Sequence, residues 1–187
     1  MYGWKTPLCV AMAAFYLVGC AATFSSFTDE STKAHIVRMK GNRLSGGLWR
    51  AELDAQRYEK DGLISYSLFV VYTGPLFLNI EPGKSLTLLI DGKSIAIEGS
   101  GSERHRIFIS PGLVEEIAYY HNIDKELVRS IADAKHVTVE VRGTKSVLER
   151  SFKKKNFNNF KEFYRNYLEK DMVSNNRQQA PGNKTAD

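Results

Sequence analysis

The sequence predicts an α+β fold that is mostly antiparallel β and sandwich-like, with seven to nine short strands and two helices. Apolar and polar residues alternate with period two over most of the chain, and glycine or proline turns separate these segments. Helical spacing appears in only two segments, both in the second half. The length of 187 residues suits one domain, and 43% hydrophobic with 25% charged residues argues against a disordered, collagen-like or coiled-coil chain. A mean hydropathy of −0.31 excludes a multi-span membrane protein.

A long hairpin is the first predicted element. Trp49, Ala51, Leu53 and Ala55 recur at every second position, which predicts a strand with one buried and one solvated face. The predicted solvated face carries Arg50, Glu52, Asp54 and Gln56. Residues 59–62 end in Asp-Gly and turn the chain into a second strand at 63–73.

Shorter strands follow, separated by turns. We expect them at 76–80, 86–90, 93–98, 104–110, 113–120, 135–142 and 146–152. Asp91-Gly92 is a two-residue hairpin signal between two of these strands. Turns this tight join antiparallel neighbours, which favours an antiparallel sheet.

Two helices complete the predicted domain, which we place at 35–173. Asp124 is a suitable N-cap for a short helix at 125–134. Aromatic residues at helical spacing predict a second helix at 157–172, with Asn159 and Glu162 as a capping pair and Phe160 packed on a sheet. Residues 174–187 lack apolar periodicity, and we expect them to be disordered.

The N-terminus has the layout of a secretory signal. A single basic residue, Lys5, precedes an uncharged apolar stretch at 7–18. This stretch ends in Leu17-Val18-Gly19-Cys20, which resembles the lipobox of bacterial lipoproteins. The resemblance implies a signal peptide at 1–19, cleavage between Gly19 and Cys20, and a Cys20 that carries an S-diacylglyceryl group and an N-acyl chain. The residue after Cys20 is alanine rather than aspartate, which by resemblance to lipoproteins of enteric bacteria favours the periplasmic side of the outer membrane.

Two other interpretations of the apolar N-terminus stay open. Residues 7–24 form an uncharged run at the lower length limit of a transmembrane helix, so an uncleaved single-pass anchor is one alternative. A buried core helix is the other. In the lipoprotein interpretation, 20–34 is the lipidated cysteine with a Ser/Thr-rich flexible tether, whose fourteen residues would span about 20 Å. Because Cys9 is removed and Cys20 carries lipid, the mature chain would contain no free thiol.

Motifs for catalysis, cofactors or metals are not apparent. The four histidines, His35, His105, His121 and His136, lack metal-ligand spacing. The sequence contains neither a nucleophile elbow nor a Walker-type lysine after a glycine-rich loop. One cluster combines carboxylates, aromatic rings and an imidazole, namely Glu115, Glu116, Tyr119, Tyr120 and His121. Such groups could act in acid–base catalysis, but adjacent glutamates on a strand face opposite sides.

Basic residues suggest a second kind of surface. Lys153, Lys154 and Lys155 with Arg104 and Arg106 could contact anionic lipid or lipopolysaccharide, although a solvated loop before a helix is the simpler interpretation. The sequence contains no nucleic-acid-binding motif. We therefore expect a membrane-anchored envelope lipoprotein that acts as a binding, interaction or assembly module with an envelope protein partner. The alternative is an envelope enzyme with its site near Glu115–His121.

Overall fold

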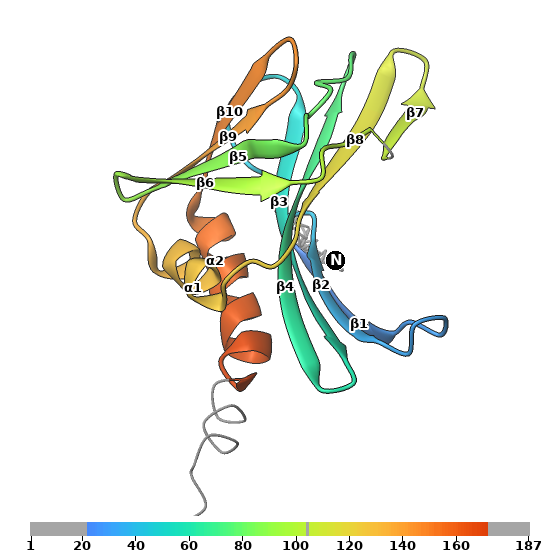
Figure 1. Cartoon of the computed structure of the whole chain (residues 1–187). Helices are drawn as coiled ribbons and strands as arrows, with labels where there is room; N and C mark the ends of the chain where they lie inside the picture. Colours follow the sequence, from blue (N-terminus) through green and yellow to red (C-terminus); the bar gives the residue numbers. More distant parts are fainter. Residues whose placement is uncertain (1–21, 104, 172–187) are drawn as a thin grey trace, which may run out of the picture.

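The computed structural model describes residues 22–103 and 105–171, and its strands form two antiparallel sheets (Figure 1). The six-stranded sheet has the order β1 (Thr23–Thr28), β2 (His35–Lys40), β3 (Arg50–Lys60), β4 (Leu63–Gly74), β8 (Leu113–Tyr120) and β7 (Arg106–Ser110). The four-stranded sheet has the order β10 (Val147–Ser151), β9 (Val137–Arg142), β5 (Gly83–Ile90) and β6 (Lys93–Gly99). Together with its helices the chain is α+β and sandwich-like, as predicted.

One face of the six-stranded sheet carries the core. The four-stranded sheet lies against one part of this inner face, and the helices α1 (Lys125–Asp133) and α2 (Lys154–Phe163) lie beside it on the same side (Figure 1). A π-helical turn, η1 (Tyr164–Leu168), continues α2. Both sheets and all three helical elements contribute buried apolar residues to a single cluster. The other face of the six-stranded sheet is its outer face.

The central hairpin β3–β4 confirms the predicted alternation on its inner face except at Trp49, which precedes β3 and is exposed. Ala51, Leu53 and Ala55 are buried there. The predicted solvated face is wrong at Glu52 and Asp54, which are only 4% and 1% exposed. The chain after β2 runs alongside β3, where Arg43 forms a bridge with Glu52, and the Asp54 carboxylate accepts the backbone N–H groups of Gly41 and Asn42 at 3.2 and 2.8 Å. Alternation shows which side chains share a face but not which segment later covers that face.

Most of the remaining strands confirm the pattern, with one exception. The β5–β6 hairpin turns at Asp91-Gly92, and both residues have positive φ values of 47° and 87°, as a type I′ turn requires. The strand predicted at 76–80 is instead a loop, with one isolated bridge between Ile80 and Gly143. This loop runs from the end of β4 in one sheet to β5 in the other, and the N–H groups of residues 78–80 bind the Glu116 carboxylate instead of a neighbouring strand.

The first helix begins as predicted, whereas the second begins earlier. Asp124 accepts the N–H of Glu126 at 3.0 Å and caps α1. Helix α2 begins at Lys154 rather than at residue 157, and Asn156, not the predicted pair Asn159 and Glu162, accepts the N–H of Lys153 at 2.8 Å. Asn156 and Asn159 are both buried and both donate to the Oδ1 of Asn42. The predicted basic loop at 153–155 is thus the first turn of a packed helix.

The tether predicted at 20–34 is wrong for residues 23–28. These residues form β1, which pairs with β2 along its whole length from Thr23–Lys40 to Thr28–His35. Two aromatic residues hold this polar strand: Phe24 packs on Tyr167 with ring centroids 6.2 Å apart, and the Arg38 guanidinium lies 6.0 Å from the Phe27 ring. The folded domain therefore includes β1 and Ala22, which is part of the core, and does not start at residue 35.

Candidate functional site

The predicted cluster Glu115–His121 is divided between the two faces of β8. Residues Glu116 and Tyr120 point into the core, whereas Glu115 and Tyr119 lie on the outer face. His121 follows the strand, and its Nδ1 lies 3.1 Å from the Ser67 Oγ. The structure therefore does not bring the two glutamates together, and neither forms a hydrogen bond with His121.

Glu116 is the anchor of a loop. Its fully buried carboxylate accepts the backbone N–H groups of Leu78, Asn79 and Ile80 at 2.6, 3.2 and 2.7 Å. Ser102 donates a further, short hydrogen bond to the same carboxylate. Because four donors use both oxygens, this group fixes the loop between β4 and β5 in place.

The aromatic members of the cluster also have structural partners. Burial raises the pKa of Tyr120 to about 12, and its hydroxyl lies 3.1 Å from the Ser85 Oγ. The Tyr119 ring stacks on Phe69 and on His121, at 5.7 and 5.9 Å between centroids, and meets His105 edge-on at 5.0 Å. The three other rings thus surround Tyr119.

A cavity of about 310 Å³ lies on this outer face. It is lined by three cations and three carboxylates around an apolar floor: Thr23, Arg38, Lys40, Gly41, Arg50, Glu52, Asp54, Phe69, Val71, Glu115, Ile117 and Tyr119. The pKa of Asp54 is raised to about 7. Burial is the main cause and the nearby Glu52 charge adds to it, while the hydrogen bonds from Asn42 and Gly41 act in the opposite direction. Glu52 accepts a 2.5 Å hydrogen bond from the Arg50 Nε. Glu115 thus shares a cavity with two carboxylates that the sequence analysis placed in solvent.

Strand β7, at an edge of the six-stranded sheet, exposes consecutive large apolar side chains. Its consecutive residues Ile107, Phe108 and Ile109 are 52%, 82% and 46% exposed. Phe108 meets Phe77 edge-on at 5.3 Å, and the exposed Leu76 precedes Phe77. We call Leu76, Phe77 and residues 107–109 the β7 edge.

The other three sheet edges are polar or charged. In β1 the exposed residues are threonines and serines apart from Phe27, and β6 exposes Lys93, Ser94 and Glu98. Strand β10 exposes Val147 at its start, followed by Glu149 and Ser151. Charged and polar side chains protect edge strands from pairing with other chains. Of the edges in the described part of the chain, β7 is the one with three apolar residues in succession.

The loop that supports the β7 edge is rigidly held. Glu116 fixes residues 78–80, as described above, and Arg106 donates to the Asn79 Oδ1 at 2.5 Å. The Arg106 guanidinium also lies 5.8 Å from the Phe77 ring. The predicted basic patch therefore loses Arg106 to internal contacts, while Arg104 lies outside the described residues. The pattern at 104–110 predicts a strand but does not show that this strand lies at an edge of the sheet.

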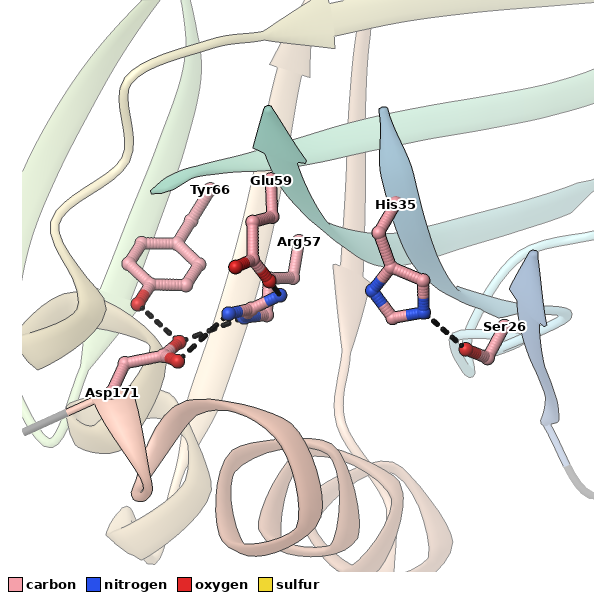
Figure 2. Close-up of polar contacts among 6 residues, drawn as sticks. All are labelled: Ser26, His35, Arg57, Glu59, Tyr66 and Asp171. Atoms are coloured by element: carbon pink, nitrogen blue, oxygen red, sulfur yellow. Dashed lines mark hydrogen bonds and ion pairs between the residues drawn. The ribbon is translucent and has the colours of Figure 1, made fainter. Parts of the chain in front are cut away.

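A second polar cluster joins Asp171, the last described residue, to the β3–β4 hairpin (Figure 2). The buried Arg57 of β3 donates from Nε and Nη2 to the two Asp171 oxygens, both at 2.8 Å, and from Nη1 to Glu59 at 2.7 Å. Tyr66 donates to Asp171 at 2.8 Å, and burial followed by this hydrogen bond raises the Tyr66 pKa. In the same view, Ser26 and His35 form a separate contact of 2.9 Å between β1 and β2. The Arg57–Asp171 pair clamps the end of the last helical segment onto the six-stranded sheet.

Several sequence predictions lie outside the described residues: the signal peptide, the Gly19–Cys20 cleavage site, the lipidated Cys20 and the tail at 174–187. The alternative anchor at 7–24 loses its last two residues, because Thr23 and Phe24 belong to β1. Within residues 22–103 and 105–171, no helix is both long and apolar enough to cross a bilayer. Among the same residues, no three His, Cys, Asp or Glu side chains are placed to hold a metal ion.

Comparisons of the chain with protein-family models, with curated proteins and with solved structures returned no match.

Proposed function

We propose that the chain is a lipid-anchored protein of the bacterial cell envelope that binds a protein partner through the β7 edge. The observation that carries the binding role is the exposure of Ile107, Phe108 and Ile109 on an edge strand. The lipobox-like sequence Leu17-Val18-Gly19-Cys20 supports the anchor, and Ala21 favours the outer membrane. Two or more acyl chains on Cys20 would hold the protein stably on a membrane.

The β7 edge would bind an extended segment of the partner protein. A sheet edge presents a row of backbone N–H and C=O groups to an added strand, and side-chain contacts on alternate faces then give specificity. Phe108 packs on Phe77 on one face of β7 and Ile107 lies on the other, while Ile109 lies at a β-bulge between Phe108 and Ser110. A partner strand with apolar residues on both faces would bury all of these side chains.

The rigid loop beneath the edge favours binding over accidental exposure. Phe77 is held by Arg106 and by the loop that Glu116 anchors, so the surface exists before a partner arrives. A preorganised surface loses less conformational entropy on binding than a mobile one.

The test places a photo-crosslinking residue at Phe108 and, as a matched control, at Val147, an apolar residue 56% exposed on the edge strand β10. We expect crosslinking in intact envelopes from position 108 to one defined envelope protein, and none from position 147. Ile109→Lys should abolish the product, whereas Val147→Lys should leave it unchanged. Equal crosslinking from both positions, or crosslinking from 108 only to a second copy of this chain, would refute the proposal. Mass analysis of the Cys20 peptide tests the anchor separately.

A further inference from the structure

We infer that the bilayer surface lies directly against the part of the outer face around Thr23, Arg38, Lys40 and Arg50. This inference rests on the proposed lipidation of Cys20 and adds an orientation to it. The four residues line the same cavity and belong to β1, β2 and β3. The partner is the phosphate-containing headgroup layer of the membrane that holds the acyl chains.

The chain between the proposed lipid on Cys20 and the first strand of the fold is short. Ala22 is buried in the core, and Thr23 is paired with Lys40. Only residues 21 and 22 separate Cys20 from Thr23. Since an extended chain spans at most about 3.6 Å per residue, the Cys20 Cα lies within about 11 Å of the Thr23 Cα. The acyl chains would therefore enter the bilayer beside β1, not at the end of a long tether.

Charged side chains surround Thr23 on the outer face. Lys40 is exposed, the Arg50 side chain is 51% exposed, and Arg38 is half-buried over the Phe69 ring. Glu52 and Asp54 line the same cavity, but both are buried: Glu52 pairs with Arg50, and Asp54 accepts the N–H groups of Gly41 and Asn42. The third carboxylate, Glu115, lies on β8. Lys40 is therefore an exposed cation in register with Thr23, while Arg50 is half-exposed and paired with Glu52.

The distance and the charge act together. Electrostatic attraction to anionic headgroups falls off over a Debye length of about 8 Å at physiological ionic strength. Because Thr23 pairs with Lys40, a Cys20–Thr23 distance of at most about 11 Å keeps Lys40 at a distance from the headgroups comparable to the Debye length. A tether of fourteen residues would not do so. The attachment point thus makes a few cations sufficient to fix the orientation of the domain.

This orientation directs the four-stranded sheet away from the membrane. Strand β1 and the β5–β6 hairpin lie on opposite sides of the β3–β4 hairpin (Figure 1). A matched pair of exposed serines marks the two sides, Ser25 in β1 and Ser94 in β6. Ser25 is paired with Arg38, one of the proposed membrane-facing cations.

The experiment uses the full chain, lipidated in cells and reconstituted into vesicles of phosphatidylcholine with or without phosphatidylglycerol. Ser25→Cys and Ser94→Cys each supply the sole free thiol, since Cys9 is removed with the leader and the Cys20 sulfur carries lipid. Each thiol carries a fluorophore, and a quencher is attached to the lipid headgroups. We expect several-fold stronger quenching at position 25 than at 94, with a larger difference in the anionic vesicles.

A second pair of variants tests the charge. Lys40→Glu should reduce quenching at position 25 in anionic vesicles, whereas Lys93→Glu on β6 should leave it unchanged. Equal quenching at positions 25 and 94, or no effect of Lys40→Glu, would overturn the inference. Failure of the chain to bind vesicles, with an unmodified Cys20 by mass analysis, would instead refute the proposed anchor. The two failures are therefore distinguishable.

Discussion

The buried carboxyl group of Asp54 makes folding stability depend on pH in a direction opposite to that of most aspartates. Its pKa is raised from 3.8 to about 7 in the folded chain, mainly by burial. Below pH 3.8 the group is protonated in both states. Between 3.8 and 7 it is protonated in the folded state and ionised in the unfolded state, so unfolding releases a proton and rising pH favours unfolding.

The size of the effect follows from the two pKa values. Each pKa unit corresponds to about 1.4 kcal/mol, so the free energy of unfolding falls by about 4 kcal/mol between pH 3.8 and pH 7 because of this group. Asp54→Asn removes the titration while keeping an oxygen that can accept the Asn42 N–H. We therefore expect the variant to gain stability relative to the natural chain as the pH rises through this window.

Urea unfolding followed by circular dichroism at a series of pH values measures this difference. Asp133→Asn is the control. The Asp133 carboxylate is exposed at the end of α1, and its ion pair with Arg129 is long, with an N···O distance of 3.7 Å. If the curves for Asp54→Asn and the natural chain run parallel from pH 4 to pH 8, the argument from burial is wrong. A relative gain confined to Asp54→Asn supports it.

Three further predictions concern stability. Asp171→Ala leaves the buried Arg57 with Glu59 as its carboxylate partner, and we expect a loss of about 3 kcal/mol by urea unfolding; a loss below 1 kcal/mol would show that the clamp is dispensable. Phe160→Ala removes a fully buried ring at the centre of α2 and should cost about 3–5 kcal/mol, measured by thermal melting, with an unchanged melting temperature as the contrary result. Backbone hydrogen bonds from His136 and Lys135 lower the pKa of Asp91, so the stability that it contributes is present above pH 3.8 and is lost as the pH falls through its folded pKa. Asp91→Asn should therefore be less stable than the natural chain at pH 7 but not in strong acid, and a pH-independent difference would contradict this.

The hairpin strands could be predicted because their pattern is local. Ala51, Leu53 and Ala55 face the core in register with β4, as period-two alternation indicates. Asp91-Gly92 likewise determines its own turn through positive φ values. The same alternation failed for Asp54, because its carboxylate accepts N–H groups from a segment twelve to thirteen residues earlier that runs alongside β3.

Long-range contacts explain the other misses. The serines and threonines of β1 resemble a linker in composition, and only the pairing with β2 and the Phe24–Tyr167 contact make them a strand. Glu116 resembled a candidate acid or base, but its role depends on a loop 36 to 38 residues away in the chain. The edge position of β7 follows from strand order, which no local pattern contains.

The Arg57–Asp171 clamp also has a consequence for how the chain is made. The pair joins residues 114 positions apart, so it can form only after Asp171 has been synthesised. Contacts between residues far apart in the sequence slow folding, because the chain loses conformational entropy on closing the loop before the contact contributes any stabilisation. A chain exported as proposed must remain unfolded while it is threaded through the membrane. Completing the fold at its C-terminal end would leave the emerging polypeptide open until translocation has begun.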